Sequence, residues 1–355
     1  MEKNKTKIVI SGWYGPGNIG DEAILQALIE EFKNKYKYVD ITVLSFNPKY
    51  NKKIHQINTV YQIPSSIKRW IWSIITLNFF KTFKALKKCD VFIMGGGGFL
   101  SDWPNKDVPK QWLKQFKIIK FLGKKKKTYI YKMGVGPFVK KYNEKLVKKY
   151  VDNYVDEIIV REKYSYKELK RIGINKNINI EIDPVATMDS EKYITKDVTD
   201  DKIIGIIYTK YFNDDKEKWE KLFHLYKKQI SIILKKGFKV RLLFFQPSFE
   251  MDLAERFKKI FSDKVEMLFL KDFKEAFNEL QKCKGIISFR LHGNIMAYNL
   301  NKPFLPIIYH YKTAGFLDLI NYDKEVIEVG DGFNWKNFSD EKEWINETVS
   351  FLESL

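Results

Sequence analysis

The sequence is poor in cysteine and in histidine. Two cysteines, Cys89 and Cys283, occur in 355 residues, which excludes the disulfide framework of a small secreted domain and is typical of reduced cytosolic thiols. Four histidines are too few to indicate a site built from several histidine ligands. We therefore expect no bound metal and no other cofactor, and a location in the cytoplasm.

Long hydrophobic runs are absent as well. The longest apolar stretch, residues 70–80, is interrupted by three polar residues, and it is about half as long as the ~20 residues that a membrane-spanning helix needs. The charged residues 1–7 lack the apolar span and the cleavage site of a signal peptide. We therefore expect a protein that is not integral to a membrane.

Acidic residues are outnumbered, with 44 Asp and Glu against 63 Lys and Arg, which gives a net charge of +19. Residues 64–132 hold sixteen of the basic residues and three acidic ones, so this stretch carries thirteen of the net charges, and large apolar side chains such as Trp72 and Phe80 are interleaved with them. Such a surface suits the anionic inner face of a membrane, on which the protein would sit peripherally. The alternatives are ordinary solvated lysines and a nucleic-acid surface, which ranks lowest because no recognition motif accompanies the charge.

The chain is long enough for about two domains. Short apolar runs alternate with longer amphipathic stretches, a pattern typical of α/β proteins. One amphipathic stretch, residues 215–236, precedes Gly237, which would end a helix. The strands are expected at residues 7–12, 41–46, 91–94, 128–132 and 157–160 in the first half, and at 203–208, 240–245, 265–268, 285–289 and 304–308 in the second.

Two nine-residue segments repeat the same order of residues. Residues 86–94 and 280–288 each run from Leu through Lys-Cys into a hydrophobic strand. The repeat favours two doubly wound Rossmann-like domains that face a cleft, because ligands of such sheets bind beyond the carboxyl ends of the strands. We expect the first domain at 1–183 and the second at 184–335. Residues 336–355 would form a closing helix with Ser339 as its N-cap, packed back on the first domain.

Two glycine-rich segments follow expected strands. The first, residues 11–25, turns into a helix whose backbone N–H groups offer an anion site. It is neither a Walker loop nor a clean dinucleotide fingerprint, so a plain chain turn is the alternative. The second has four successive glycines, which indicates close approach of a substrate or of the other domain. The residues concerned are Gly15, Gly17, Asn18, Gly95, Gly96, Gly97 and Gly98.

Three cationic side chains follow two neighbouring strands that we expect in the second half. Arg290 and His292 lie on the same side of the chain where strand gives way to helix, and Lys312 holds a similar place one unit later. Arg presents a fork for carboxylate or phosphate, and His transfers protons near neutral pH. A capping or core role is the alternative for each residue alone. Together they predict an anion-binding catalytic site.

Seven motifs occur in an order that is known from one family. They are Gly-Pro-Gly-Asn-Ile-Gly-Asp-Glu-Ala (15–23), Gly-Gly-Gly-Gly (95–98), Met-Gly-Val-Gly-Pro (133–137), Val-Arg-Glu (160–162), Asp-Pro (183–184), Arg-Leu-His (290–292) and Tyr-x-x-Lys (309–312). On these residues the sequence resembles the polysaccharide pyruvyl transferases. The resemblance implies a glycosyltransferase-B-like fold, with the acceptor side in the first domain and the donor side in the second.

The resemblance also implies a reaction in which the enolpyruvyl unit of phosphoenolpyruvate passes to a sugar hydroxyl, closing a cyclic ketal with release of phosphate. Arg290, His292 and Lys312 fall on the donor-binding and catalytic positions of the family. Phosphoenolpyruvate carries a carboxylate and a phosphate, so its site needs fixed cations. His292 is the candidate acid that protonates the methylene carbon, and Asp21 is a candidate for accepting the hydroxyl proton.

Three further residues complete the predicted donor site. Asn294 is counted with the donor-binding residues, although it and Tyr298 stand where the family has small or apolar residues. The third anion ligand is open between Arg161 and Lys140, since an Arg is expected near the latter position.

The predicted function is pyruvyl transfer to a sugar of a cell-surface polysaccharide or of its lipid-linked precursor. A nucleotide-sugar-dependent glycosyltransferase of similar fold is the first alternative, and a catalytically silent anion-binding protein is the second.

Overall fold

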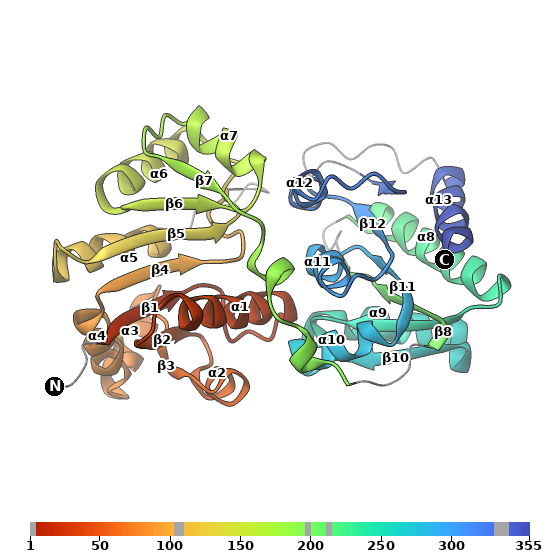
Figure 1. Ribbon diagram of the computed structural model, residues 1–355, viewed down its shortest axis with the longest axis horizontal. Helices are drawn as coiled ribbons and strands as arrows, with labels where there is room; N and C mark the ends of the chain where they lie inside the picture. Colours follow the sequence, from red (N-terminus) through yellow and green to blue (C-terminus); the bar gives the residue numbers. More distant parts are fainter. Residues whose placement is uncertain (1–4, 103–109, 196–199, 211–214, 330–340) are drawn as a thin grey trace. The chain divides into compact units, whose positions relative to one another are not determined.

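The computed structural model describes residues 5–102, 110–195, 200–210, 215–329 and 341–355. The chain divides into two compact units, Met1–Pro184 and Val185–Leu355, and each unit is a parallel sheet covered by helices (Figure 1). The α/β class and the two Rossmann-like domains predicted from the sequence are confirmed.

The first unit holds a seven-stranded sheet in the order β3-β2-β1-β4-β5-β6-β7, in which every pair is parallel. Its strands are β1 (Thr6–Ser11), β2 (Val39–Ser45), β3 (Asn58–Tyr61), β4 (Val91–Gly95), β5 (Lys127–Met133), β6 (Glu157–Val160) and β7 (Ile178–Ile180). Its helices are α1 (Ile19–Lys35), α2 (Pro48–His55), α3 (Ile67–Ile75), α4 (Asn78–Lys88), α5 (Lys110–Leu122), α6 (Lys141–Tyr154) and α7 (Lys163–Arg171).

The second unit holds a six-stranded parallel sheet in the order β10-β9-β8-β11-β12-β13. Its strands are β8 (Asp200–Ile207), β9 (Lys239–Phe244), β10 (Val265–Phe269), β11 (Cys283–Ser288), β12 (Phe304–Ile308) and β13 (Ile327–Glu328). Its helices are α8 (Lys216–Lys235), α9 (Pro247–Phe261), α10 (Phe273–Gln281), α11 (Leu291–Asn299), α12 (Tyr311–Leu319) and α13 (Glu341–Ser354), with short 3-10 turns at Pro184–Thr187, Glu191–Tyr193 and Ser262–Lys264.

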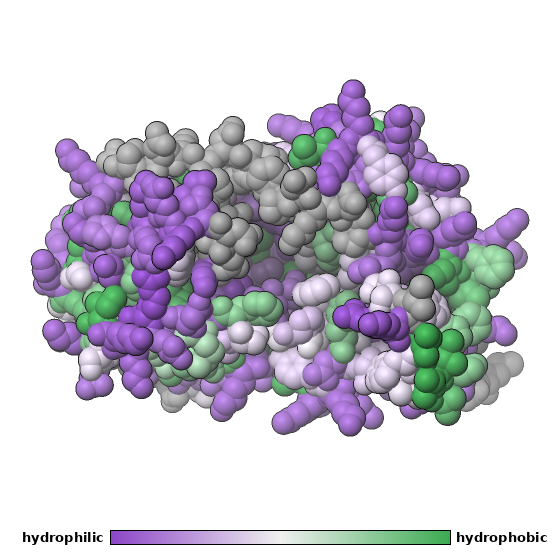
Figure 2. Space-filling model, turned by 180° about the vertical axis from the view of Figure 1, so that it is seen from behind, coloured by the Kyte–Doolittle hydropathy of each residue, from purple (hydrophilic) through white to green (hydrophobic). Residues whose placement is uncertain are grey.

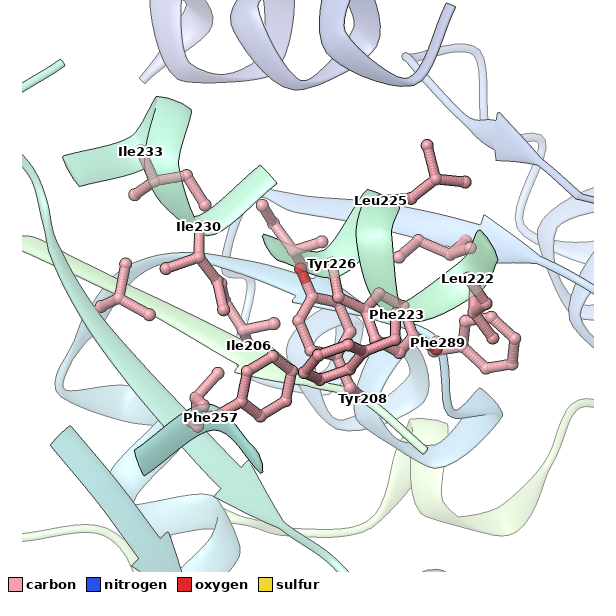
Figure 3. Packing of buried hydrophobic residues seen from close by; sticks show 14 of the residues in the cluster. Ile206, Tyr208, Leu222, Phe223, Leu225, Tyr226, Ile230, Ile233, Phe257 and Phe289 are labelled. Carbon is pink, nitrogen blue, oxygen red and sulfur yellow. The ribbon is translucent and has the colours of Figure 1, made fainter. Parts of the chain in front are cut away.

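Continuous apolar runs form the central strands because both faces of each sheet are covered. All five residues of β4 and all five of β12 are buried, as is usual in parallel sheets that lie between two helix layers. In the second unit Tyr208, just after β8, and Tyr226 on α8 belong to an aromatic core, where their rings stack with centroids 3.7 Å apart (Figure 3). Phe289 packs edge-on against Tyr226 and is fully buried. This anchors the chain immediately before Arg290.

The last helix belongs to the second unit. Helix α13 packs on α8. Its apolar residues Trp344, Phe351 and Leu352 are buried in the core of the second unit, and Gln229 on α8 donates a 2.8 Å hydrogen bond to the hydroxyl of Thr348. The predicted N-cap, Ser339, lies outside the described residues.

Candidate active site

The glycine turn after β1 leads into α1 with a defined cap. The side chain of Asn18 accepts a hydrogen bond of 3.1 Å from the backbone N–H of Gly20, which occupies an otherwise unpaired donor at the helix start. Gly15 and Gly17 have φ values of +100° and +83°, which side-chain-bearing residues rarely adopt. The predicted loop residues therefore form a turn whose backbone conformation requires glycine.

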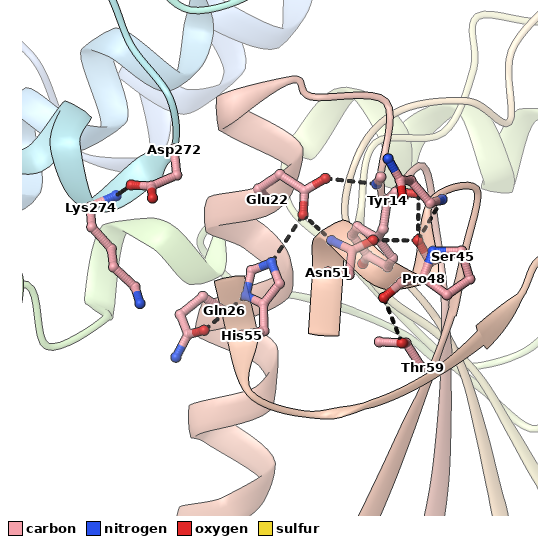
Figure 4. Close-up of polar contacts among 12 residues, drawn as sticks. Tyr14, Glu22, Gln26, Ser45, Pro48, Asn51, His55, Thr59, Asp272 and Lys274 are labelled. Carbon is pink, nitrogen blue, oxygen red and sulfur yellow. Dashed lines mark hydrogen bonds and ion pairs between the residues drawn. The ribbon is translucent and has the colours of Figure 1, made fainter. Parts of the chain in front are cut away.

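A buried carboxylate supports this turn from inside the first unit, and the sequence reasoning missed it. Glu22 accepts a 2.7 Å hydrogen bond from the backbone N–H of Gly15. Its second oxygen lies 2.5 Å from Nδ2 of Asn51 and 3.0 Å from Nε2 of His55 (Figure 4). The other ring nitrogen of His55 lies 2.9 Å from Oε1 of Gln26. Two features of the sequence could have indicated this network. They are the acidic residue in the first turn of α1 and the spacing of Asn51 and His55 by one turn on α2.

The four-glycine segment lies beside the Met-Gly-Val-Gly-Pro segment. The backbone N–H of Gly134 donates to the carbonyl of Gly97 at 3.0 Å, and that of Gly136 donates to the carbonyl of Leu100 at 2.7 Å. A Cβ on Gly96 would lie 2.1 Å from Cγ2 of Ile24. Two motifs far apart in the sequence thus form one loop pair, and Gly96 permits its close packing on α1.

Carboxylates gather near this loop pair. Asp21 is buried in the first turn of α1, and a Cβ on Gly97 would lie 3.5 Å from its Oδ1. The Tyr14 hydroxyl donates a 2.5 Å hydrogen bond to the carbonyl of Gly95. Burial raises the pKa of Tyr14 well above its ordinary value, and the charges of Asp21, Glu22 and Asp183 raise it further.

The two candidates for the third anion ligand belong to the first unit. Arg161, just after β6, is buried and its Nη1 lies 2.6 Å from Oδ2 of Asp183, while its Nε lies 3.4 Å from Oε2 of Glu162. Lys140 is half-buried before α6, and its backbone N–H donates a 2.9 Å hydrogen bond to Asp102. The charge of Arg161 is therefore already opposed by two carboxylates of its own unit.

In the second unit Arg290 stands between the end of β11 and the start of α11. Its Nε and Nη2 donate to Oε1 of Glu250 at 3.0 and 2.5 Å, and Nη2 lies 3.5 Å from Oε1 of Gln246. Glu250, in the first turn of α9, is fully buried and its other oxygen accepts a 2.9 Å hydrogen bond from the backbone N–H of Gln246. Within the described part of the chain, Nη1 of Arg290 makes no hydrogen bond. Sequence reasoning missed Glu250.

The turn that carries Arg290 and His292 is held by buried polar groups. The Ser288 hydroxyl donates to the carbonyl of Arg290 at 2.8 Å. Asn294 is fully buried in α11, and its Nδ2 lies 3.4 Å from the carbonyls of both Ser288 and Arg290. These contacts make Asn294 a residue that positions the turn. His292 is half-buried in the first turn of the same helix.

Lys312 lies one strand further along the sheet, in the first turn of α12. The ring of His310 caps this helix, since its Nδ1 accepts a 3.3 Å hydrogen bond from the backbone N–H of Lys312. Nζ of Lys312 lies 5.8 Å from the ring centroid of Tyr311. Burial raises the pKa of Tyr309, and the nearby charge of Arg290 opposes this shift. The ring of Tyr309, just after β12, stacks on Phe289 with centroids 4.3 Å apart, so the residue before Arg290 packs at the end of β12.

The predicted residues therefore form two sets. Gly15, Gly17, Asn18, Asp21, the four glycines, Lys140 and Arg161 belong to the first unit, and Arg290, His292, Asn294 and Lys312 belong to the second. In each unit the central residues follow the carboxyl ends of neighbouring strands, β1 and β4 or β11 and β12, where ligands of open parallel sheets bind. No group of three or more His, Cys, Asp or Glu side chains able to hold a metal ion occurs among the described residues.

Solved structures share the fold at low sequence identity. UDP-N-acetylglucosamine 2-epimerase from Rickettsia bellii has a TM-score of 0.60 at 13% identity, with 99% of this chain and 97% of that chain covered. The epimerase from Methanocaldococcus jannaschii, in complex with UDP-GlcNAc and UDP, has a TM-score of 0.54 at 15% identity, covering 99% and 100%. ADP-heptose lipopolysaccharide heptosyltransferase II from Escherichia coli has a TM-score of 0.52 at 12% identity, covering 98% and 99%. The predicted glycosyltransferase-B-like fold is confirmed.

No curated protein matches the sequence. The family model for polysaccharide pyruvyl transferase matches residues 18–311. The match includes Asn18, Asp21, the four-glycine segment, Arg290 and His292, and ends one residue before Lys312. The chain belongs to the polysaccharide pyruvyl transferase family.

Proposed function

We propose that the protein transfers a pyruvyl group from phosphoenolpyruvate to a sugar of a cell-surface polysaccharide or of its lipid-linked precursor. One sugar hydroxyl oxygen forms a bond to C2 of the enol while a proton is added to the methylene carbon, which becomes a methyl group. A second hydroxyl of the same sugar then bonds to C2 as the C2–O bond to phosphate breaks. The product is a cyclic pyruvate ketal, and the second hydroxyl proton leaves with inorganic phosphate.

The donor groups of this proposal lie in the second unit. Arg290 is oriented by Glu250 through two hydrogen bonds to one carboxylate oxygen, and its Nη1 is left for an anionic oxygen of phosphoenolpyruvate. Lys312, at the start of α12, supplies a second cation. His292, two residues after Arg290, is the proposed acid for the methylene carbon. Fixed cations stabilise the charge that develops on the leaving phosphate.

The acceptor groups lie in the first unit. Asp21, beside the four-glycine segment, is the proposed base for the sugar hydroxyl. The glycine loops allow the sugar to approach the backbone closely. The third anion ligand is Lys140 or Arg161, and the charge of Arg161 is opposed by Asp183 and Glu162. We further propose that the protein works in the cytoplasm, on the inner face of the membrane that carries the acceptor.

One observation carries the proposal: the Arg-Leu-His segment at 290–292 lies within the residues that the family model matches, at the carboxyl end of β11, and a buried Glu holds its Arg. The experiment is a thermal-shift screen that compares phosphoenolpyruvate with UDP- and GDP-sugars. We expect phosphoenolpyruvate to raise the melting temperature of the wild-type protein and not that of Arg290→Ala. Phosphate release from phosphoenolpyruvate on addition of a sugar acceptor then tests the reaction itself.

A nucleotide-sugar-dependent glycosyltransferase is the second candidate. The observation in its favour is the fold shared with the M. jannaschii epimerase, whose structure contains UDP-GlcNAc and UDP. Protection by a nucleoside diphosphate or a nucleotide sugar, without protection by phosphoenolpyruvate, would select this candidate. Tight binding of phosphoenolpyruvate with no turnover across a panel of acceptors would instead indicate an anion-binding protein without catalysis.

A further inference from the structure

Helices α3 and α4 expose an unusual amount of apolar surface. Ile75 is 74% exposed and Leu77 is 61% exposed, and Figure 2 shows the hydrophobic area over these two helices at its lower right. Soluble proteins seldom leave such a continuous apolar area without a partner. We define the α3–α4 face by its exposed apolar side chains, which are Ile71, Trp72, Ile74, Ile75, Leu77, Phe80 and Phe83.

The α3–α4 face is presented by an ordered helical hairpin. Leu77 has a φ of +58° and turns the chain from α3 into α4. Between the helices the rings of Trp70 and Phe79 pack with centroids 5.4 Å apart. The Thr82 hydroxyl donates a 2.8 Å hydrogen bond to the carbonyl of Tyr61 at the end of β3. The hairpin thus has its own interior and a fixed attachment to the sheet, so its outer apolar residues are a surface feature of the folded unit.

The charge around this face has one sign. Between residues 64 and 89 the chain has six basic residues and no acidic one. All six are exposed: Lys68, Arg69, Lys81, Lys84, Lys87 and Lys88. Basic residues attract anionic lipid headgroups, and apolar side chains between them reach the acyl chains. In a two-fold dimer the same surface lies on both sides of the interface, so a second copy would bring like charges together.

Trp72 connects the α3–α4 face to the carboxyl edge of the first sheet. It packs edge-on against Tyr61 with centroids 5.3 Å apart. Together with Arg69, Phe46 and Gln62 these two rings line a pocket of about 330 Å³. The pocket follows the ends of β2 and β3, on the edge where open parallel sheets bind ligands. A bilayer at the α3–α4 face would therefore lie next to a ligand-binding edge.

We propose that the α3–α4 face docks on the anionic surface of a lipid bilayer, with its apolar side chains inserted below the headgroups and its six basic residues among them. Both helices lie in the plane of the interface. Among the described residues, no helix has the length and apolar character needed to cross a bilayer. This inference rests on the proposed function only where it takes the sugar acceptor to be carried by the membrane. The docking itself requires no substrate.

The test is co-sedimentation of the whole protein with vesicles of phosphatidylcholine alone or of phosphatidylcholine mixed with phosphatidylglycerol. We expect binding to the mixed vesicles that weakens with added salt, and little binding to the neutral ones. The variant Ile75→Gln/Phe80→Gln should bind at least about tenfold more weakly, because it removes two inserted apolar groups. The matched control, Phe249→Gln/Ile260→Gln, changes one exposed Phe and one exposed Ile on α9 and should bind as the wild type does.

Fluorescence gives a second readout. Brominated lipids in the mixed vesicles should quench tryptophan emission of the wild-type protein, and Trp72→Phe should lose part of this quenching while it still sediments with the vesicles. Lysines outside the hairpin are not changed in this test. Lys126, for example, supports the end of α4, because its Nζ donates to the carbonyls of Lys87 and Cys89. Lys81→Glu/Lys84→Glu tests the charge in the hairpin itself.

Equal vesicle binding by the wild type and by the Ile75→Gln/Phe80→Gln variant would overturn the proposal. The proposal would also be overturned if the wild type did not bind anionic vesicles but formed a dimer that the same substitutions dissociate. The α3–α4 face would then be an interface between two copies of the chain. Failure of the docking leaves turnover of a soluble acceptor intact, whereas failure of the proposed function leaves vesicle binding intact. The two outcomes are therefore distinguishable.

Discussion

The carboxylate of Glu250 accepts two hydrogen bonds from the guanidinium of Arg290, although forty residues separate them in the chain. Glu250 is fully buried at the start of α9, and Arg290 is partly exposed at the end of β11. The buried acid therefore fixes the direction of the cation that we place against the donor substrate. A group held in this way is already oriented before the substrate binds.

Substitution of Glu250 should separate orientation from charge. We expect Glu250→Ala to lower kcat/KM for phosphoenolpyruvate at least about tenfold, because Arg290 loses its fixed geometry. Glu250→Gln should keep most of the activity, since its amide oxygen still accepts from Arg290. Steady-state phosphate release measures both. Glu220→Ala, which removes the exposed partner of Arg256, serves as the control and should change little. A Glu250→Ala enzyme with wild-type kcat/KM would contradict the positioning role.

Loss of His292 should remove chemistry and leave binding. We expect His292→Ala to lower kcat by about 10²–10⁴, the usual contribution of a general acid. Protection from thermal unfolding by phosphoenolpyruvate should persist, because Arg290 and Lys312 remain. The control is His224→Ala, which removes an exposed histidine on α8 near Glu341. Undiminished phosphate release by His292→Ala would exclude His292 as the acid.

A methyl group at Gly96 should destabilise the first unit. Gly96 has a φ of +69°, and its added Cβ would lie 2.1 Å from the buried Ile24. We expect Gly96→Ala to lower the free energy of unfolding by about 2–4 kcal/mol, from backbone strain and overpacking together. Gly237→Ala separates these causes, because its φ is +87° but nothing lies within 4 Å, so it should cost about 1–2 kcal/mol. Urea unfolding measures both, and equal losses would show that the contact with Ile24 does not matter.

His55 should contribute to stability through Glu22. Its ring bridges the carboxylate of Glu22 and the side chain of Gln26. Removing a partner of a buried carboxylate costs about 1–3 kcal/mol or more, so we expect His55→Ala to lower the free energy of unfolding by at least that amount. Hydrogen exchange at the backbone N–H of Gly15, which Glu22 holds, should become faster. Unchanged exchange there would contradict a link between the buried network and the glycine turn.

The two thiols should make stability depend on alkaline pH. Burial raises the pKa of Cys89 to about 11 and that of Cys283 to about 12, whereas an unfolded chain has thiols with a pKa of about 8.5. The contribution of the two protonated thiols to the free energy of unfolding is therefore fully present below about pH 8.5. It is lost as the pH rises toward 11 and 12.

Urea titrations of the wild type and of Cys89→Ser/Cys283→Ser between pH 8 and 10 measure this difference. The wild type should lose stability more steeply with pH than the variant. A thiol reagent at pH 8 should modify neither cysteine in the native protein and both in urea, since both are buried and free. Rapid labelling of the native protein would contradict the burial.

Local sequence determined the central strands and several helix ends. The apolar run at 91–94 became β4 because a strand covered on both faces needs apolar residues throughout. Helix α8 begins after Asp215, whose side chain accepts from the backbone N–H of Lys218, close to the predicted start. The short edge strands β3, β7 and β13 were not predicted. They have two to four residues, which is too short for a clear hydrophobic pattern. Each of them forms only by pairing with the adjacent strand of its sheet.

The sequence by itself determined the types and spacing of Arg290 and His292, because both residues stand in one turn between a strand and a helix. It also determined the family to which the chain belongs. Only the tertiary structure decided that Glu250 holds Arg290, that Glu22 and His55 support the first glycine turn, and that α13 covers α8. Each of these depends on which buried surfaces meet. An amphipathic helix or a lone acidic residue does not encode its partner, because burial and hydrogen bonding are satisfied between segments that only the completed sheets bring together.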